Sequence, residues 1–124
     1  MLTVDPIELG NPKAHHYLLG AVGPRPICFA STIDSEGNRN LAPFSFFNVF
    51  SSNPPVAIFS PSRSGRTGKQ KDTYNNIKEV PEVVINLVNH SMVEQMSLSS
   101  SPYQSNVDEF LKSGLTPLKS ESVR

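Results

Sequence analysis

The chain has 124 residues, 37% of them hydrophobic and 18% charged, and its 11 basic and 11 acidic residues give a net charge of zero. This length allows one domain, residues 1–124, with a modest core, and the composition is that of a soluble globular protein rather than a disordered one. A neutral chain has no overall field that would draw it to nucleic acid or to an anionic membrane, so we expect neither as a partner.

The single cysteine, Cys28, stands in the apolar run Ile27-Cys28-Phe29-Ala30, where we expect a small buried hydrophobic residue rather than a nucleophile. One cysteine makes no internal disulfide, which fits a reducing compartment. The N-terminus lacks a positively charged region that leads into a long apolar run. These features predict a cytoplasmic protein without a signal sequence or a membrane span.

The first expected element is a short helix near the N-terminus. Asn11 is a good N-cap and Pro12 suits the first helical position, so the pattern predicts a helix that ends near Gly20 or Gly23. The Pro24-Arg25-Pro26 segment that follows is expected to be extended, because proline disfavours the helical region for the residue before it.

Three strands are expected in the first half of the chain. Residues 27–33 and 39–47 form a predicted hairpin across a turn of about five residues at 34–38. Pro54-Pro55 opens a third strand, which ends at Phe59.

The second half adds one strand and three helices. Residues 82–88 are rich in β-branched side chains and are the strongest predicted strand. Helices are expected within residues 68–80, 91–96 and 107–112, the last of them ending at Gly114. The predicted class is mainly β with short helices, an α+β protein. Four strands are too few to close a barrel, so the open sheet needs cover, for example from a second subunit.

A basic, hydroxyl-rich loop follows the third predicted strand and suits a phosphate group. Arginine offers a planar fork to phosphate oxygens, lysine adds a point charge, and a helix that begins nearby would add backbone N–H donors. The hydroxyl and basic side chains of this segment are Ser60, Ser62, Arg63, Ser64, Arg66, Thr67, Lys69, Lys71 and Thr73. A plain solvated basic loop is the alternative.

The triphosphate-binding loop is a rival motif that the sequence excludes. It requires glycine five residues before Gly68, where this chain has Arg63, and serine or threonine after Lys69, where it has Gln70.

Phenylalanine dominates the strand before this loop. Phe44, Phe46, Phe47 and Phe50 would place rings on both faces of a strand, as expected between a core and either a ligand or a second subunit. Core packing alone is the alternative. Ser45 interrupts the run and could hydrogen-bond the polar edge of a buried flat ring. An aromatic phosphate such as flavin mononucleotide (FMN) would use both surfaces.

No acid–base pair and no metal site competes with this interpretation. His15 and His16 are neighbours that would point to different faces of a helix, and His90 is remote in sequence. We therefore expect no catalytic side chain, and any redox chemistry would belong to the cofactor.

Several motifs resemble, in order and spacing, the flavin reductase-like family, and within it the branch of flavoredoxin and the reductase component of nitrilotriacetate monooxygenase. The similarity runs from about residue 22 to residue 116. Its motifs are Pro24-Arg25-Pro26-Ile27, Ser31-Thr32, Gly37, Asn40-Leu41-Ala42-Pro43-Phe44-Ser45-Phe46-Phe47-Asn48, Asn53-Pro54-Pro55, Lys71-Asp72-Thr73, Asn76-Ile77, Val107-Asp108-Glu109-Phe110 and Gly114-Leu115-Thr116.

The resemblance implies an FMN-binding split β-barrel, a homodimer with FMN near the subunit interface, and hydride transfer from NADH or NADPH to flavin. By motif, Ser31 and Thr32 would lie along the ribityl–phosphate part. The ring would be lined by Ala42, Pro43, Phe44 and Ser45. The phosphate would be held by Ser60, Arg63, Lys71 and Thr73, while Asp72 would order the loop or cap the helix.

The chain departs from this family in length. Members commonly continue with further strands, whereas this chain ends eight residues after Thr116. We therefore expect an incomplete barrel that lacks the C-terminal strands. The main functional prediction is a flavin reductase that passes electrons to an oxygenase or another acceptor. The alternatives are a flavoredoxin-like electron carrier without efficient NAD(P)H oxidation and a non-catalytic structural domain.

Overall fold

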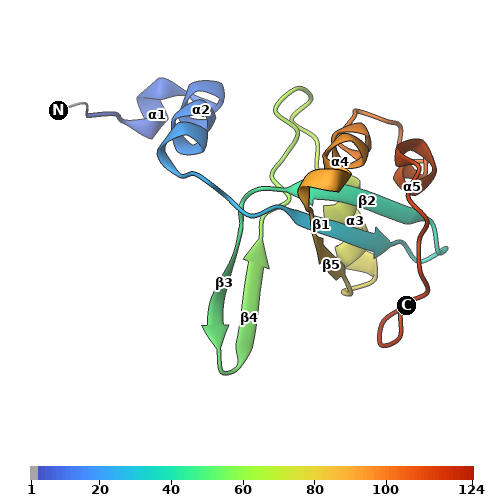
Figure 1. Cartoon of the computed structure of the whole chain (residues 1–124). Coiled ribbons are helices and arrows are strands. Elements are labelled where there is room, and N and C mark those ends of the chain that lie inside the picture. The colour runs from blue at the N-terminus through green and yellow to red at the C-terminus, as the bar shows by residue number, and fades with distance from the viewer. Residues whose placement is uncertain (1–2) are drawn as a thin grey trace.

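The computed structural model describes residues 3–124. Its strands form two separate antiparallel sheets, neither of which closes into a barrel (Figure 1). The three-stranded sheet has the order β2-β1-β5 and the two-stranded sheet pairs β3 with β4. The strands are β1 Cys28–Ile33, β2 Arg39–Phe44, β3 Phe47–Ser52, β4 Pro55–Phe59 and β5 Val84–Leu87.

The predicted hairpin between β1 and β2 is confirmed. Its turn is organised by Asp34, whose Oδ1 accepts hydrogen bonds from the backbone N–H groups of Glu36 (2.9 Å) and Asn38 (2.8 Å). Gly37 has a φ of 89°, a conformation that favours glycine. The side-chain hydrogen bond from Asn38 is the main cause that lowers the pKa of Asp34 below its ordinary value.

The prediction of a single strand over residues 39–47 is wrong, because the chain bends at Ser45 and Phe46 and leaves the first sheet. Phe44 faces the core of the three-stranded sheet, whereas Phe47 pairs with Phe59 in the second sheet. One continuous strand cannot serve both sheets, so the bend separates them. The β3–β4 hairpin that results accounts for a fifth strand that the sequence did not predict.

Both faces of the three-stranded sheet carry buried side chains. Side chains alternate along β1, so Cys28 and Ala30 lie on one face, where they form the buried core with Phe44. Phe29 lies on the opposite face and is also buried. The expectation that Cys28 is a buried hydrophobic residue is confirmed.

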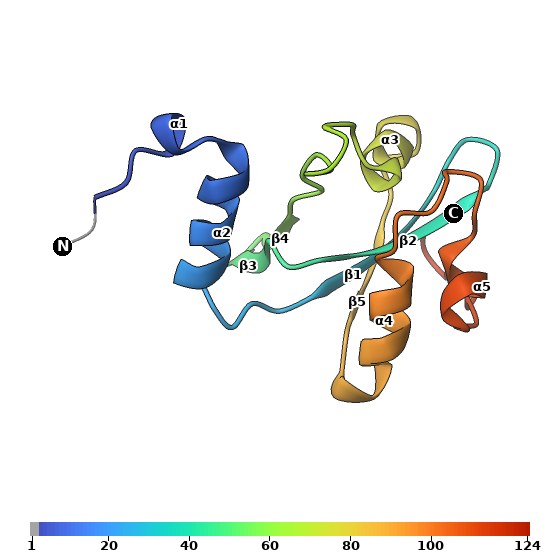
Figure 2. The ribbon, with the colours of Figure 1, turned by 90° about the horizontal axis from the view of Figure 1, so that it is seen from above.

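Helices lie on both sides of this sheet, with α3 on one side and α4 and α5 on the other (Figure 2). The predicted helices of the second half are present, and α3 lies within the range 68–80 expected for it. Their bounds are α3 Asp72–Glu79, α4 Val93–Ser99 and α5 Glu109–Ser113, with the short 3-10 turn η1 His90–Met92 leading into α4. Gly114 ends α5 with a φ of 71°, as predicted.

Two helices precede the first sheet. The predicted helix is α2, Asn11–Ala21, and it begins with Asn11 itself, so Gly10 rather than Asn11 is the N-cap. A shorter helix, α1 Pro6–Leu9, was not predicted, although Asp5 caps it by accepting from the N–H of Ile7 at 2.7 Å. Within residues 3–124 no helix has the length and apolar character that crossing a membrane requires.

Candidate functional site

The bend between β2 and β3 lies beside the C-terminal end of β4. The backbone N–H of Ser60 donates to the carbonyl of Phe46 at 2.9 Å, which fixes the end of β4 against the bend. The rings of Phe44 and Phe59 pack with centroids 5.4 Å apart. The Phe-rich segment is thus shared between the core and the bend.

Two residues that the sequence reasoning missed surround the ring of Phe46. His15 meets it edge-on with centroids 5.7 Å apart, and the guanidinium carbon of Arg25 lies 6.0 Å from its centroid. Arg25 also donates to the carbonyl oxygen of Leu19 at 2.8 Å and to that of Val22. Arg25 therefore ties the end of α2 to the bend. The signal in the sequence was the arginine between two prolines in Pro24-Arg25-Pro26, a segment for which we predicted only an extended backbone.

The basic loop closes on itself between β4 and α3. The N–H of Gly68 donates to the carbonyl of Ser64 at 2.7 Å, and the N–H of Ser64 donates to the carbonyl of Lys69 at 2.9 Å. Gly68 has a φ of 68°, which other residues rarely adopt. Arg63 donates to the carbonyl of Gly68 at 3.2 Å and remains exposed. The loop is therefore an ordered, solvent-facing turn with a positively charged rim.

Lys71 stands where this loop meets α3. It is the N-cap residue of the helix, and no side chain among residues 3–124 caps the backbone N–H groups of the first turn. By contrast, Asp5 and Asp108 cap α1 and α5. The ammonium nitrogen of Lys71 lies 5.8 Å from the centroid of the Phe44 ring. The start of α3 therefore offers uncapped N–H donors and a cation next to the core phenylalanine.

These contacts bring part of the predicted set together. Phe44 touches Phe59, the residue before Ser60, and faces Lys71. Ser45 follows Phe44 in the bend and is half-buried. Phe44, Ser45, Ser60 and Lys71 therefore gather around one region, which we call the bend site.

Four predicted residues lie apart from the bend site or are already engaged. Thr73 is only 1% exposed, and its hydroxyl donates to Asn40 Oδ1 at 2.7 Å. Thr32 is buried and its hydroxyl accepts from Asn76 Nδ2 at 3.2 Å. Ser31 points to the opposite face of the sheet from Thr32, because side chains alternate along β1. Ala42 packs against the core.

Pro43 and Arg63 complete the predicted set. Pro43 is half-buried and pairs with Phe29 across the hairpin, so it faces the other side of the sheet from Phe44. Arg63 lies exposed in the basic loop. The alternation along β2 therefore brings Ala42 and Phe44, but not Pro43, to the face on which Lys71 lies. Asp72 was expected to order the loop or to cap the helix, and it does not cap α3, since Lys71 occupies the N-cap position.

A buried acid lies close to α3. Glu109, at the start of α5, is 8% exposed, and its Oε1 and Oε2 accept from Asn40 Nδ2 (3.2 Å) and from the N–H of Leu41 (3.1 Å). Burial raises the pKa of Glu109 above its ordinary value, against the hydrogen bonds from Leu41 and Asn40, which lower it, and Asp72 adds to the rise. In the sequence, Glu109 stood out only as part of the helix expected over residues 107–112 and of one family motif.

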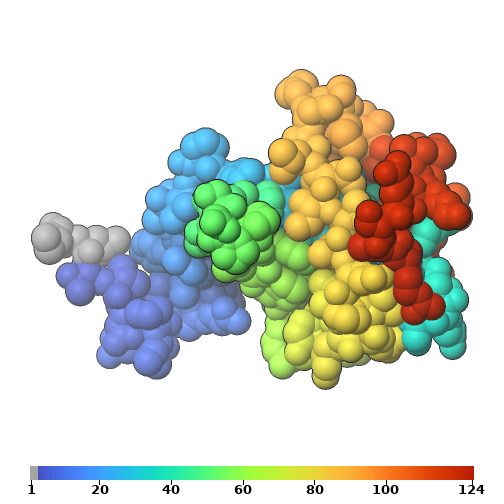
Figure 3. Space-filling view, turned by 90° about the horizontal axis from the view of Figure 1, so that it is seen from below, coloured from blue at the N-terminus to red at the C-terminus, as the bar shows by residue number. Residues whose placement is uncertain are grey.

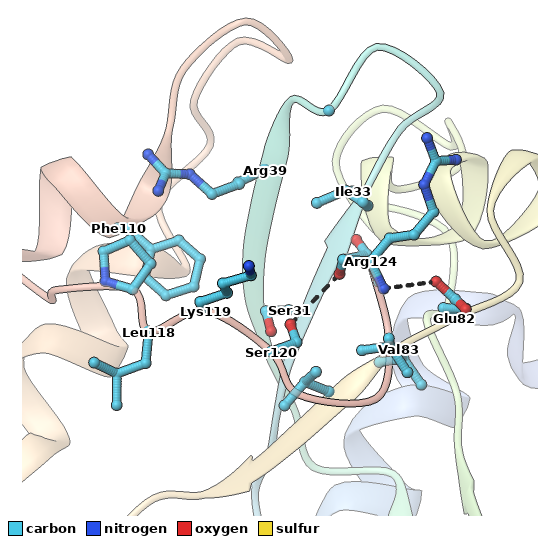
Figure 4. A pocket seen from close by; sticks show the side chains of 15 residues that line it. Ser31, Ile33, Arg39, Glu82, Val83, Phe110, Leu118, Lys119, Ser120 and Arg124 are labelled. Atoms are coloured by element: carbon cyan, nitrogen blue, oxygen red, sulfur yellow. Dashed lines mark hydrogen bonds between the residues drawn. The ribbon is translucent and has the colours of Figure 1, made fainter.

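Two cavities lie outside the bend site. One, of about 470 Å³, is formed between β1, the approach to β5 and the C-terminal segment, where Arg39, Phe110 and Lys119 surround it (Figure 4). The other, of about 480 Å³, is polar and includes Asp72 and Asp108 in its lining. Of the predicted site residues, only Ser31 and Thr32 line either of these two cavities. Among residues 3–124 no three His, Cys, Asp or Glu side chains are grouped to hold a metal ion.

Two open antiparallel sheets joined at a bend, with short helices on both sides, define an incomplete split barrel. The family model described as flavin reductase like domain matches residues 21–123. The chain therefore belongs to the flavin reductase-like family, as the sequence motifs predicted. Membership in this family supports a flavin-related oxidoreductase.

Individual proteins are similar to this chain over most of its length. A protein of Aquifex aeolicus is 44% identical over 94% of this chain and 59% of its own length. The crystal structure of nitrilotriacetate monooxygenase component B from Bacillus cereus is 32% identical, has a TM-score of 0.90, and is matched over 99% of this chain and 60% of that one. A Shewanella frigidimarina structure described as a flavin reductase with a split barrel domain is 27% identical, with a TM-score of 0.74 over 93% of this chain and 55% of that one.

The shared region is only part of these proteins. The chain spans less than two thirds of the length of each relative and structure described above.

Proposed function

We propose that the chain binds FMN at the bend site and forms part of an NAD(P)H-dependent flavin reductase. The observation that carries this proposal is the contact of the Phe44 ring with Lys71, which stands at the uncapped start of α3. It combines an aromatic surface with a cation and open backbone donors, as a flat ring carrying a phosphate requires.

The donor set at this junction suits a phosphate dianion. Lys71 and Arg63 would neutralise its charge, and the hydroxyl of Ser60 and the first N–H groups of α3 would donate to its oxygens. Thr73 would contribute its backbone N–H rather than its hydroxyl, because the hydroxyl proton is already donated to Asn40 Oδ1. Asp72 bears a carboxylate at the same helix start and would oppose the phosphate, so it is not part of the proposed set.

The ring would lie along the bend, where the Ser45 hydroxyl and nearby backbone groups would satisfy its polar edge. Ala42 and Phe44 would form the wall on the β2 side, whereas the ring of Pro43 faces the other side of the sheet. Ser31 and Thr32 are the weakest members of the proposed set. Ser31 faces the other side of the sheet, and the hydroxyl of Thr32 accepts a hydrogen bond from Asn76.

The protein's part in the reaction is to position the cofactor and to exclude water. When bound, FMN would supply the redox chemistry, taking a hydride from NADH or NADPH and passing two electrons to a second acceptor. The side chains of the bend site would hold the phosphate and orient the ring, which fixes the distance that the hydride has to cross. Similarity to a monooxygenase component supports an oxygenase as one class of acceptor.

We also propose a homodimer, with the second subunit covering the open side of the bend site. The β3–β4 hairpin projects away from the three-stranded sheet (Figure 1), and its tip faces the viewer when the molecule is seen from below (Figure 3). Its side chains Val49 and Phe50 are 66% and 65% exposed. An apolar projection of this kind supports pairing with another subunit.

Two measurements on the purified chain test the function. The visible absorption of oxidised flavin, either copurified or after addition of FMN, is expected to shift on binding. Rapid anaerobic bleaching with NADH or NADPH is expected for a reductase. Binding without bleaching would instead indicate an electron carrier, and no binding would leave a structural domain.

A further inference from the structure

Three buried polar side chains form a chain of hydrogen bonds around the free edge of β2. The carboxylate of Glu109 in α5 accepts from Asn40 Nδ2 at 3.2 Å, and Asn40 Oδ1 accepts from the hydroxyl of Thr73 in α3 at 2.7 Å. All three residues are less than 9% exposed. We call this set the edge relay. It links helices that lie on opposite faces of the sheet.

The charge of Glu109 sets the direction of the edge relay. An ionised carboxylate only accepts, and its second oxygen is engaged by the N–H of Leu41 at 3.1 Å. Asn40 must therefore present its amide NH₂ to Glu109 and its carbonyl oxygen to Thr73. The Thr73 hydroxyl must then donate. A neutral amide in place of Glu109 would not impose this order.

The edge relay ends at the first turn of α3, where the structure has little apolar anchorage. Thr73 is the buried residue of α3. The next polar attachment along the helix is the bond from Asn76 to Thr32 at 3.2 Å. The position of the helix start, and with it the orientation of Lys71, therefore depends strongly on the bond that Thr73 makes to Asn40.

We propose that Glu109 is a positioning residue for the phosphate end of the flavin site, acting through Asn40 and Thr73; this inference rests on FMN binding at the bend site. Glu109 itself touches no part of the ligand. Its carboxylate holds the start of α3 so that Lys71 and the first backbone N–H groups converge on the phosphate.

The test compares FMN with riboflavin, which has the same ring system but no phosphate. Dissociation constants for both flavins are measured by flavin fluorescence titration of the purified chain and of the Glu109→Gln variant. We expect FMN binding to weaken about tenfold, the equivalent of about 1.4 kcal/mol, while riboflavin binding stays within about twofold. A purely structural role would weaken both flavins in proportion.

Two further variants keep the test decisive if Glu109→Gln folds poorly. Thr73→Val preserves shape but removes the donor, and it is expected to reproduce the selective loss of FMN affinity. Ser113→Ala is the matched control, because its hydroxyl donates within α5 to the carbonyl of Glu109 at 2.7 Å and takes no part in the edge relay. It is expected to change stability but not the FMN-to-riboflavin ratio.

The outcomes separate the two proposals. If the unchanged chain prefers FMN to riboflavin but Glu109→Gln and Thr73→Val keep that preference, the positioning role is overturned and the proposed function stands. If the unchanged chain binds neither flavin, the proposed function itself is overturned. A selective loss in both variants, absent from Ser113→Ala, supports the inference.

Discussion

The ammonium nitrogen of Lys71 lies 5.8 Å from the centre of the Phe44 ring, which joins the residue before α3 to the last residue of β2. A cation held over an aromatic face is attracted to it and is partly positioned before any ligand arrives. We expect Lys71→Ala to weaken FMN binding by about 1–3 kcal/mol, the range for losing a charge-assisted hydrogen bond. A fluorescence titration measures this directly.

Lys78→Ala is the matched control for this prediction. Lys78 is exposed and lies in the last turn of the same helix, at the end remote from Lys71. The control variant is expected to bind FMN like the unchanged chain. Equal affinities of the Lys71 and Lys78 variants would exclude Lys71 from the phosphate site.

Local patterns in the sequence predicted much of the fold. The turn around Asp34 and Gly37 and the end of α5 at Gly114 follow from short-range rules on turns and caps, and the structure confirms them. The break at Ser45 and Phe46 could not be predicted in the same way. It arises because the chain leaves the first sheet after Phe44 and pairs with β4 in the second sheet from Phe47 onward, and this pairing depends on residues distant in the sequence.

The candidate site was predictable only in outline. Sequence composition indicated a basic loop and an aromatic strand, and the structure joins them through Phe44 and Lys71. The engagement of the Thr73 hydroxyl could not be foreseen, because Asn40 lies 33 residues earlier in the chain. Glu109 was missed for the same reason, since its partner is again Asn40, at a separation of 69 residues.

Burial is expected to make the Cys28 thiol unreactive. The side chain is fully buried, and burial raises the pKa of the thiol to about 11. Since the thiolate is the reactive form, we expect almost no modification by a thiol reagent at pH 8 in the folded protein and stoichiometric modification in denaturant. Mass spectrometry after a timed exposure measures both. Rapid modification of the folded chain would show that the β1–β2–β5 core opens readily.

The raised pKa of Glu109 gives the stability of the protein a pH dependence with a defined sign. In the folded state Glu109 holds its proton at pH values where the unfolded chain has already lost it. The unfolded state then binds fewer protons, so the free energy of unfolding falls as pH rises through the window that begins at the ordinary value of 4.5. The charges that face Glu109 from neighbouring elements include Asp72, which raises its pKa further.

Glu109→Gln removes this titration. We expect the stability of the unchanged chain, relative to that of the variant, to decrease as pH rises above 4.5. Urea unfolding at a series of pH values measures the difference. Asp34 acts in the opposite sense, because its pKa is lowered, and its contribution is lost only as pH falls below the ordinary value of 3.8. Parallel stability curves above pH 4.5 would contradict the role given to burial of Glu109.

The β3–β4 hairpin provides the last prediction, since it exposes apolar side chains outside the core. Val49 continues the face on which Phe47 packs, because residues two apart in a strand share a face, yet Val49 is 66% exposed. If this surface pairs with a second subunit, Val49→Asp removes about 1–2 kcal/mol of apolar burial per site and leaves a carboxylate without a partner. We expect the dimer dissociation constant to rise at least about tenfold.

Light scattering across a concentration series measures this shift, and circular dichroism checks that the variant is folded. Leu111→Asp is the matched control, because Leu111 is 74% exposed but lies on α5, away from the hairpin. Since the partner would cover the bend site, Val49→Asp is also expected to weaken FMN binding, whereas Leu111→Asp is not. A monomeric unchanged chain at micromolar concentration, or equal behaviour of the two variants, would show that the hairpin does not form the interface.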